Sequence, residues 1–126
     1  MNSPRSKILI VDDERMLRLG LARCMENAGF ETLTAEDGEQ ALALVRAEKP
    51  GLVVLDVMMR GMNGLDVCRA LRSDPSARGI RIVFLSARGQ ERERAEGLEA
   101  GADYYMTKPF DYRDLIRVVK QLMEND

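Results

Sequence analysis

Continuous apolar runs that end on polar side chains outline the sheet that the sequence predicts. Residues 52–55 are all Leu or Val and are followed by Asp56, and residues 8–11 are all Ile, Leu or Val and are followed by Asp12. A third run, over residues 80–85, contains one charged residue. Such runs, without regular alternation, are typical of strands buried on both faces of a parallel sheet. We therefore predict strands at residues 7–11, 32–35 (at an edge), 52–56, 80–85 and 102–106.

Apolar residues at helical spacing occupy the segments after these strands. Asp37 and Asn63 are placed to cap two of the helices. The stretch 90–100 is mostly Arg and Glu, and it offers little to the core beyond Ala95, Leu98 and Ala100. Five alternations of strand and helix with short connections predict the α/β class: one doubly wound (βα)5 domain over residues 1–126, with helices on both faces of a parallel sheet.

The composition of the chain excludes several classes of function. The chain has 126 residues, of which 45% are hydrophobic and 32% charged, and its net charge of −2 gives no strong attraction to nucleic acid or to an anionic membrane. No apolar run is long enough to span a membrane, and residues 1–6 do not resemble a secretory signal, so we expect a cytoplasmic protein. Cys24 and Cys68 are expected to be reduced thiols in the core. The absence of histidine excludes His-based zinc sites and Ser-His-Asp triads.

Polar side chains that could bind a metal ion or take part in catalysis follow four of the predicted strands. Because parallel strands end at the same edge of a sheet, we expect these side chains to meet there. Each has an ordinary explanation, since Asp13 could cap the next helix and Ser86 could be a turn residue. The combination of three carboxylates, one hydroxyl and one amine at one edge favours a functional site. Its members are Asp12, Asp13, Asp56, Ser86 and Lys108.

Clustered carboxylates predict a hard cation. Two carboxylates about 4 Å apart repel each other by about 4 kcal/mol at an effective dielectric constant near 20, which favours raised pKa values or a bound divalent ion. Oxygen ligands without His select Mg²⁺, which binds through one or two carboxylates together with phosphate. One carboxylate could then act as a nucleophile toward a phosphoryl group, whose remaining oxygens Lys108 and the Ser86 hydroxyl would stabilise.

These residues match a known family. The chain resembles the receiver domain of bacterial two-component response regulators from end to end, and in particular the stand-alone members that resemble chemotaxis regulators. Five motifs occur in the family's order and spacing: residues 8–14 (ILIVDDE), 55–64 (LDVMMRGMNG), 85–87 (LSA), 97–103 (GLEAGAD) and 108–110 (KPF). The resemblance implies the strand order 2-1-3-4-5 for the sheet.

The resemblance also implies a role for each site residue. Asp56 would accept a phosphoryl group from a phosphohistidine, and the protein would be a signalling module that catalyses its own phosphorylation and dephosphorylation. Lys108 would pair with Asp56 and then with the phosphoryl group, and the Lys108–Pro109 bond would be cis. Mg²⁺ would be held by Asp12, Asp13 (directly), Asp56 and the backbone carbonyl of Met58.

A switch and partners follow from the same resemblance. Ser86 would move toward the phosphoryl group, and Tyr105 would change rotamer with it. Because the chain lacks His, the donor must be a partner, either a sensor histidine kinase or a phosphotransfer protein. The narrow apolar stripe of the helix at 90–100 predicts weak docking, so a separate hypothesis is that this helix, the fifth strand and the last helix form the output surface for a downstream protein, with no nucleic acid or membrane involved. The alternative is an ordinary solvated helix held by Leu98 alone.

Three residues depart from the family pattern or occupy its variable positions. Arg60 stands where the family usually has Pro, which would loosen the loop after Asp56. Two positions that tune hydrolysis in the family hold Met58 and Arg88. Our hypothesis is that Met58 shields the phosphoryl group from water and prolongs its lifetime; the alternative is an exposed Met58 without kinetic effect.

Two other functions fit the sequence less well. A phosphatase of the haloacid dehalogenase type would have Asp-x-Asp after its first strand, whereas the acids here are adjacent, and no cap domain is evident. A flavin-binding module would need a phosphate loop rich in Ser, Thr or Gly at that position, where the acid pair would repel phosphate. The sequence leaves open whether the chain is a stand-alone regulator or the input part of a longer one, and it leaves open the cognate kinase, the target and the oligomeric state.

Overall fold

Five parallel strands form a single sheet with helices on both faces in the computed structural model, which describes residues 7–124. The strand order is β2-β1-β3-β4-β5, as the resemblance implied. The strands are β1 (Lys7–Val11), β2 (Glu31–Ala35), β3 (Leu52–Asp56), β4 (Arg81–Ser86) and β5 (Tyr104–Thr107). The helices are α1 (Arg15–Asn27), α2 (Gly38–Glu48), α3 (Gly64–Ser73), α4 (Glu91–Ala100) and α5 (Tyr112–Glu124).

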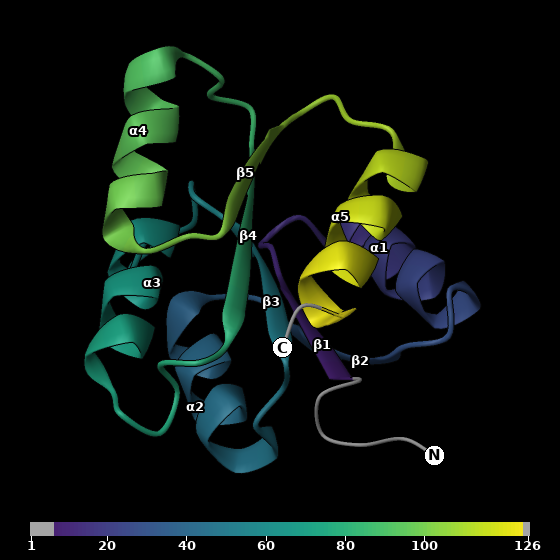
Figure 1. Cartoon of the computed structure of the whole chain (residues 1–126), viewed down its shortest axis with the longest axis horizontal. Coiled ribbons are helices and arrows are strands. Elements are labelled where there is room, and N and C mark those ends of the chain that lie inside the picture. Colours follow the sequence, from purple (N-terminus) through teal and green to yellow (C-terminus); the bar gives the residue numbers. More distant parts are fainter. Residues whose placement is uncertain (1–6, 125–126) are drawn as a thin grey trace.

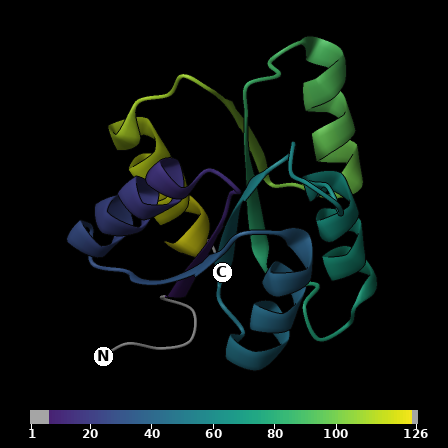
Figure 2. The same cartoon turned by 180° about the vertical axis from the view of Figure 1, so that it is seen from behind.

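Each face of the sheet has its own hydrophobic core. Helices α1 and α5 cover one face, and α2, α3 and α4 cover the other (Figures 1 and 2). Along β1, Ile8 and Ile10 belong to the core beneath α1 and α5, whereas Leu9 and Val11 belong to the core beneath the other three helices. This division explains why the strands are continuously apolar, because successive side chains enter opposite cores. None of the helices in residues 7–124 is long and apolar enough to cross a membrane.

The predicted helix caps at Asp37 and Asn63 are confirmed. The Asp37 carboxylate accepts a hydrogen bond from the Gln40 N–H at 2.8 Å, and the Asn63 side chain accepts one from the Asp66 N–H at 2.9 Å. Both cysteines are free, with Cys68 buried, but Cys24 is only half-buried, so the expectation of a core thiol fits Cys68 better.

Helix α4 packs differently from the prediction. Leu98 is 51% exposed and Ala95 is also exposed, so these two residues do not reach the core as expected. The buried residue of α4 is Gly97, and Ala100 is partly buried against the core. Helical spacing of apolar residues missed this arrangement because the contact is made by a residue without a side chain.

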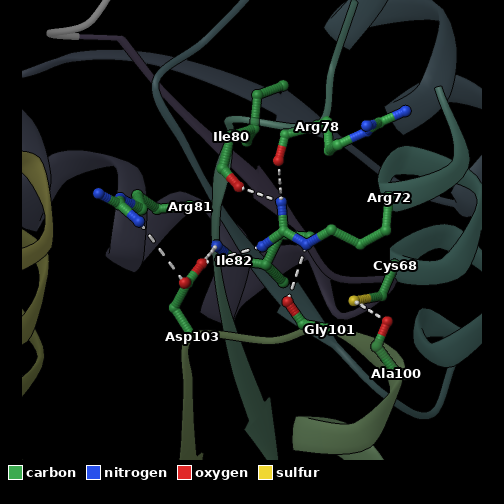
Figure 3. A network of polar contacts seen from close by, with 9 residues as sticks. All are labelled: Cys68, Arg72, Arg78, Ile80, Arg81, Ile82, Ala100, Gly101 and Asp103. Atoms are coloured by element: carbon green, nitrogen blue, oxygen red, sulfur yellow. Dashed lines mark hydrogen bonds and ion pairs between the residues drawn. The ribbon is translucent and has the colours of Figure 1, made fainter. Parts of the chain in front are cut away.

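A polar network joins α3, α4 and the starts of β4 and β5 (Figure 3). Arg72, at the end of α3, donates hydrogen bonds to the carbonyl oxygens of Gly101, Arg78 and Ile80, and its Nη2 lies 3.0 Å from Asp103 Oδ2. The same Asp103 oxygen accepts the Ile82 N–H at 2.8 Å. The network therefore fixes the C-terminal end of α4 at the edge of the sheet where β4 begins.

Candidate functional site

Three carboxylates converge at the carboxyl ends of β1 and β3. These strands are hydrogen-bonded neighbours, with Val11 paired to Leu55, so the residues that follow them are adjacent. Asp12, Asp13 and Asp56 each offer an oxygen, and these oxygens all lie within 4.8 Å of one another. Asp12 and Asp56 are 2% and 7% exposed, whereas Asp13 is exposed.

Asp12 is tightly held. Its Oδ1 accepts the Glu14 N–H at 2.8 Å, and its own N–H donates to the Ala35 carbonyl at 3.2 Å. The residue that caps α1 is Glu14, not Asp13, and its side chain makes no capping hydrogen bond. The ordinary explanation for Asp13 as a helix cap is therefore wrong, and its carboxylate is available at the acid cluster.

Lys108 brings the amine to the cluster. Its Nζ lies 3.3 Å from Asp12 Oδ2 and 3.7 Å from Asp56 Oδ2. Lys108 follows β5, which is separated from β3 by β4, and its long side chain spans that distance. The Lys108–Pro109 bond is cis, as the resemblance implied.

Asp56 has a raised pKa. Burial raises its pKa from 3.8 to about 6; the Lys108 ammonium opposes this rise, and the Asp12 carboxylate adds to it. The Met58 N–H donates to Asp56 Oδ1 at 3.2 Å. Ionising a buried acid beside two further carboxylates is unfavourable. A bound cation, or a covalent bond to a phosphoryl group, would reduce this cost.

Ser86 and Tyr105 both contact the backbone of Arg88. The Ser86 hydroxyl is fully buried and accepts the Arg88 N–H at 3.0 Å, while the Tyr105 hydroxyl donates to the Arg88 carbonyl at 2.6 Å. The Tyr105 ring packs tilted against Phe84, with 6.0 Å between ring centroids. The segment after β4 therefore links the two side chains that the resemblance identifies as a switch.

The sequence interpretation missed Arg18. This residue of α1 is buried, and its Nη1 donates to the Asp12 carbonyl oxygen at 2.8 Å. A signal was present in the sequence, because Arg18 lies three residues before Leu21 and seven before Met25, on the buried face of the helix. A charged residue at such a position needs a partner in the interior.

The donor set fits Mg²⁺. Carboxylate oxygens from three residues, without a nearby thiol or imidazole, form the hard oxygen environment that this ion prefers. The adjacent Lys108 leaves the cluster with excess negative charge. Asp12, Asp13 and Asp56 are therefore the residues that would hold the ion; a ligand role for the Met58 carbonyl stays a prediction.

Comparison with known proteins identifies the family. Residues 8–120 match the model of the response regulator receiver domain, and the chain belongs to this family. It is 45% identical over 127 residues to the DNA-binding response regulator MtrA of Mycobacterium tuberculosis, covering 100% of this chain and 54% of MtrA. It is 43% identical over 116 residues to the phosphate regulon transcriptional regulatory protein PhoB of Pseudomonas aeruginosa, covering 92% of this chain and 51% of PhoB. The chain thus spans about half the length of these relatives.

Solved structures agree with this assignment. A putative response regulator from Chloroflexus aurantiacus superposes with a TM-score of 0.90 at 32% identity, covering 94% of this chain and 98% of that one. The chemotaxis response regulator CheY4 of Vibrio cholerae superposes with a TM-score of 0.88 at 28% identity, with the same coverage. The chain is a receiver domain of the two-component type, a signalling module that carries a phosphoacceptor Asp.

Proposed function

We propose that Asp56 is the phosphoacceptor and that it receives the phosphoryl group from a phosphohistidine of a sensor kinase or phosphotransfer protein. The observation that carries this proposal is the convergence of Asp56 with two further carboxylates and with Lys108 Nζ at 3.7 Å. An isolated Asp at the end of a strand would have no need of such neighbours.

The chemistry follows from the positions of these groups. An Asp56 oxygen attacks phosphorus while the bond from phosphorus to the histidine nitrogen breaks, and the electron pair of that bond returns to the imidazole. Asp12, Asp13 and Asp56 would hold Mg²⁺, whose charge would offset that of the phosphoryl oxygens. Lys108 exchanges its ion pair with Asp56 for one with a phosphoryl oxygen. The Ser86 hydroxyl gives up the hydrogen bond that it accepts from the Arg88 N–H and donates to another phosphoryl oxygen.

Movement of Ser86 would be transmitted through Arg88. The Arg88 carbonyl is bonded to the Tyr105 hydroxyl, so displacement of this segment removes the partner that holds the buried ring. We propose that α4, β5 and α5 form the output surface and that a downstream protein docks there. MtrA is a DNA-binding response regulator, so the absence of nucleic-acid contact stays a prediction for this chain, as does a cytoplasmic location.

Mass spectrometry after incubation with acetyl phosphate and Mg²⁺ tests the acceptor. We expect one added phosphoryl group, which is absent without Mg²⁺ and absent in Asp56→Asn. Asp66→Asn is the matched control, because Asp66 is an exposed acid in the first turn of α3. An added group that persists in Asp56→Asn, or that disappears in Asp66→Asn, would contradict the assignment.

A further inference from the structure

We propose that Arg18 is a positioning residue for the metal site: it fixes the Asp12–Asp13 peptide and thereby raises the affinity of the acid cluster for Mg²⁺. This inference rests on the proposed function, since it concerns the same cluster. It assigns a role to a buried basic residue that contacts the backbone carbonyl of Asp12 rather than the carboxylates of the cluster.

The contacts of Arg18 span two loops at the functional edge. Nη1 donates to the Asp12 carbonyl oxygen at 2.8 Å, in the loop between β1 and α1. Nη2 lies 3.4 Å from Glu36 Oε1, in the loop between β2 and α2. The planar guanidinium presents several donors in a fixed fork, so one side chain can bridge both loops.

The burial of Arg18 needs an explanation of this kind. Its side chain is only 9% exposed, and desolvating a guanidinium is unfavourable unless its donors are used. Its neighbours on this face of α1, Leu21 and Met25, are fully packed, and an apolar residue at position 18 would continue their stripe. A Leu or Met at position 18 would pack equally well but could not donate a hydrogen bond to the Asp12 carbonyl. This hydrogen bond therefore explains the presence of an Arg.

Fixing the Asp12 carbonyl also fixes the start of Asp13. The peptide between them is planar, so the direction of the Asp12 C=O sets where the backbone of Asp13 begins. The Asp12 carboxylate is separately held by the Glu14 N–H and by Lys108 Nζ. The Asp13 side chain is exposed, so the backbone has a large part in placing it. Groups that orient metal ligands in this way typically change metal affinity 10–100-fold when removed.

Two effects of Arg18 on Mg²⁺ have opposite signs, which makes the proposal testable. The positive charge of Arg18 disfavours a nearby cation, whereas its hydrogen bond to Asp12 organises the ligands. Arg18→Lys keeps the charge but replaces the planar fork with a single ammonium group, so it cannot bridge both loops in the same way. Arg18→Gln removes the charge and shortens the side chain.

Mg²⁺ titration followed by amide shifts in NMR spectra separates these effects and reports folding in the same samples. We expect Arg18→Lys and Arg18→Gln to bind Mg²⁺ about tenfold more weakly than the wild type. Arg23→Lys, on an exposed position of the same helix, should leave the affinity unchanged. Equal affinity of Arg18→Lys and the wild type, or tighter binding by Arg18→Gln, would overturn the proposal while leaving the proposed function intact. A wild-type protein that binds no Mg²⁺ would overturn both.

Glu36→Gln provides a second test that does not disturb the core. Glu36 is 64% exposed, so its loss should not affect folding, and we expect about threefold weaker Mg²⁺ binding because one arm of the bridge is lost. Glu39→Gln is the control for removal of an exposed charge from the same region. If Arg18→Lys fails to fold, equal affinities of Glu36→Gln and Glu39→Gln overturn the proposal, and a selective loss in Glu36→Gln supports it.

Discussion

Gly97 and Tyr105 are packed so closely that a Cβ built on Gly97 would lie 2.7 Å from Tyr105 Cδ2. The same Cβ would lie 3.2 Å from Phe84 Cδ2. Helix α4 therefore approaches β5 through a glycine, directly over the aromatic ring that we propose as part of the switch. The position of α4 and the position of the ring are coupled by this contact, because neither can accommodate extra volume without movement of the other.

Gly97→Ala should destabilise the protein. Alanine is favoured over glycine in helices by up to about 1 kcal/mol, but overpacking against Tyr105 and Phe84 opposes this gain, and we expect a net loss of about 1–2 kcal/mol in the free energy of unfolding. Gly20→Ala in α1 is the matched control. Its Cβ would meet only the Tyr112 hydroxyl at 3.3 Å, at the tip of a partly exposed side chain, so this change should be neutral or stabilising. Urea unfolding measures both, and a stabilised Gly97→Ala would contradict the close packing.

The network around Arg72 predicts a second loss of stability. Arg72→Met removes the donors to three carbonyl oxygens and the ion pair with Asp103, and we expect a decrease of about 2–3 kcal/mol in the free energy of unfolding. Arg69→Met is the control on the same helix, because Arg69 is 58% exposed and its pairing with Asp66 is 3.8 Å long. Similar unfolding curves for the two variants would show that the network in Figure 3 contributes little.

The contacts at the C-terminal end of α4 predict which part of the helix responds to activation. Its C-terminal end is held by the Arg72 bond to the Gly101 carbonyl, whereas its N-terminal cap, Gln90, makes no side-chain capping bond. Hydrogen exchange with and without beryllofluoride should therefore change most in residues 87–96 and less in residues 97–101. Equal changes along the whole helix, or the largest change at its C-terminal end, would argue against an anchored helix.

The success and failure of the sequence interpretation have different physical causes. The strands and the convergence of Asp12, Asp13, Asp56 and Lys108 were predictable, because continuous apolar runs place their ends at one edge of a parallel sheet. Contacts to backbone carbonyl oxygens, and packing against a glycine, could not be predicted. The packing of Gly97 and the bonds of Arg18 and Arg72 to carbonyl oxygens depend on positions that residue types alone do not specify. The roles of the site residues came from the resemblance to the family.

The raised pKa of Asp56 predicts a pH dependence of stability. In the folded protein this carboxyl holds its proton up to a pKa of about 6, compared with 3.8 ordinarily, so the folded state binds more protons than the unfolded state between these values. Stability without metal should therefore fall as the pH rises from about 4 to 6 and remain lower above that range. Asp56→Asn abolishes this contribution. In EDTA, its stability advantage over the wild type should be about 1–2 kcal/mol larger at pH 7.5 than at pH 4.5, as measured by urea unfolding. An advantage that does not vary with pH would contradict the raised pKa.

Met58 supplies the last prediction, on the lifetime of the phosphorylated form. Its side chain is 51% exposed and lines a groove of about 300 Å³ with Arg88, and its backbone N–H donates a hydrogen bond to Asp56 Oδ1 at 3.2 Å. An apolar side chain at this place hinders the approach of water to an acyl phosphate, whereas Asn could orient water by hydrogen bonding. We expect Met58→Asn to release phosphate several-fold faster after loading with acetyl phosphate and removal of the donor.

Met16→Asn is the control for this measurement. Met16 is 76% exposed on α1, and this substitution makes the same change of side chain at a position that does not line the groove. Its rate of phosphate release should equal that of the wild type. Equal rates for all three proteins would mean that Met58 is an exposed residue without kinetic effect. A slower rate in Met58→Asn would mean that the methionine promotes hydrolysis, which is the reverse of shielding.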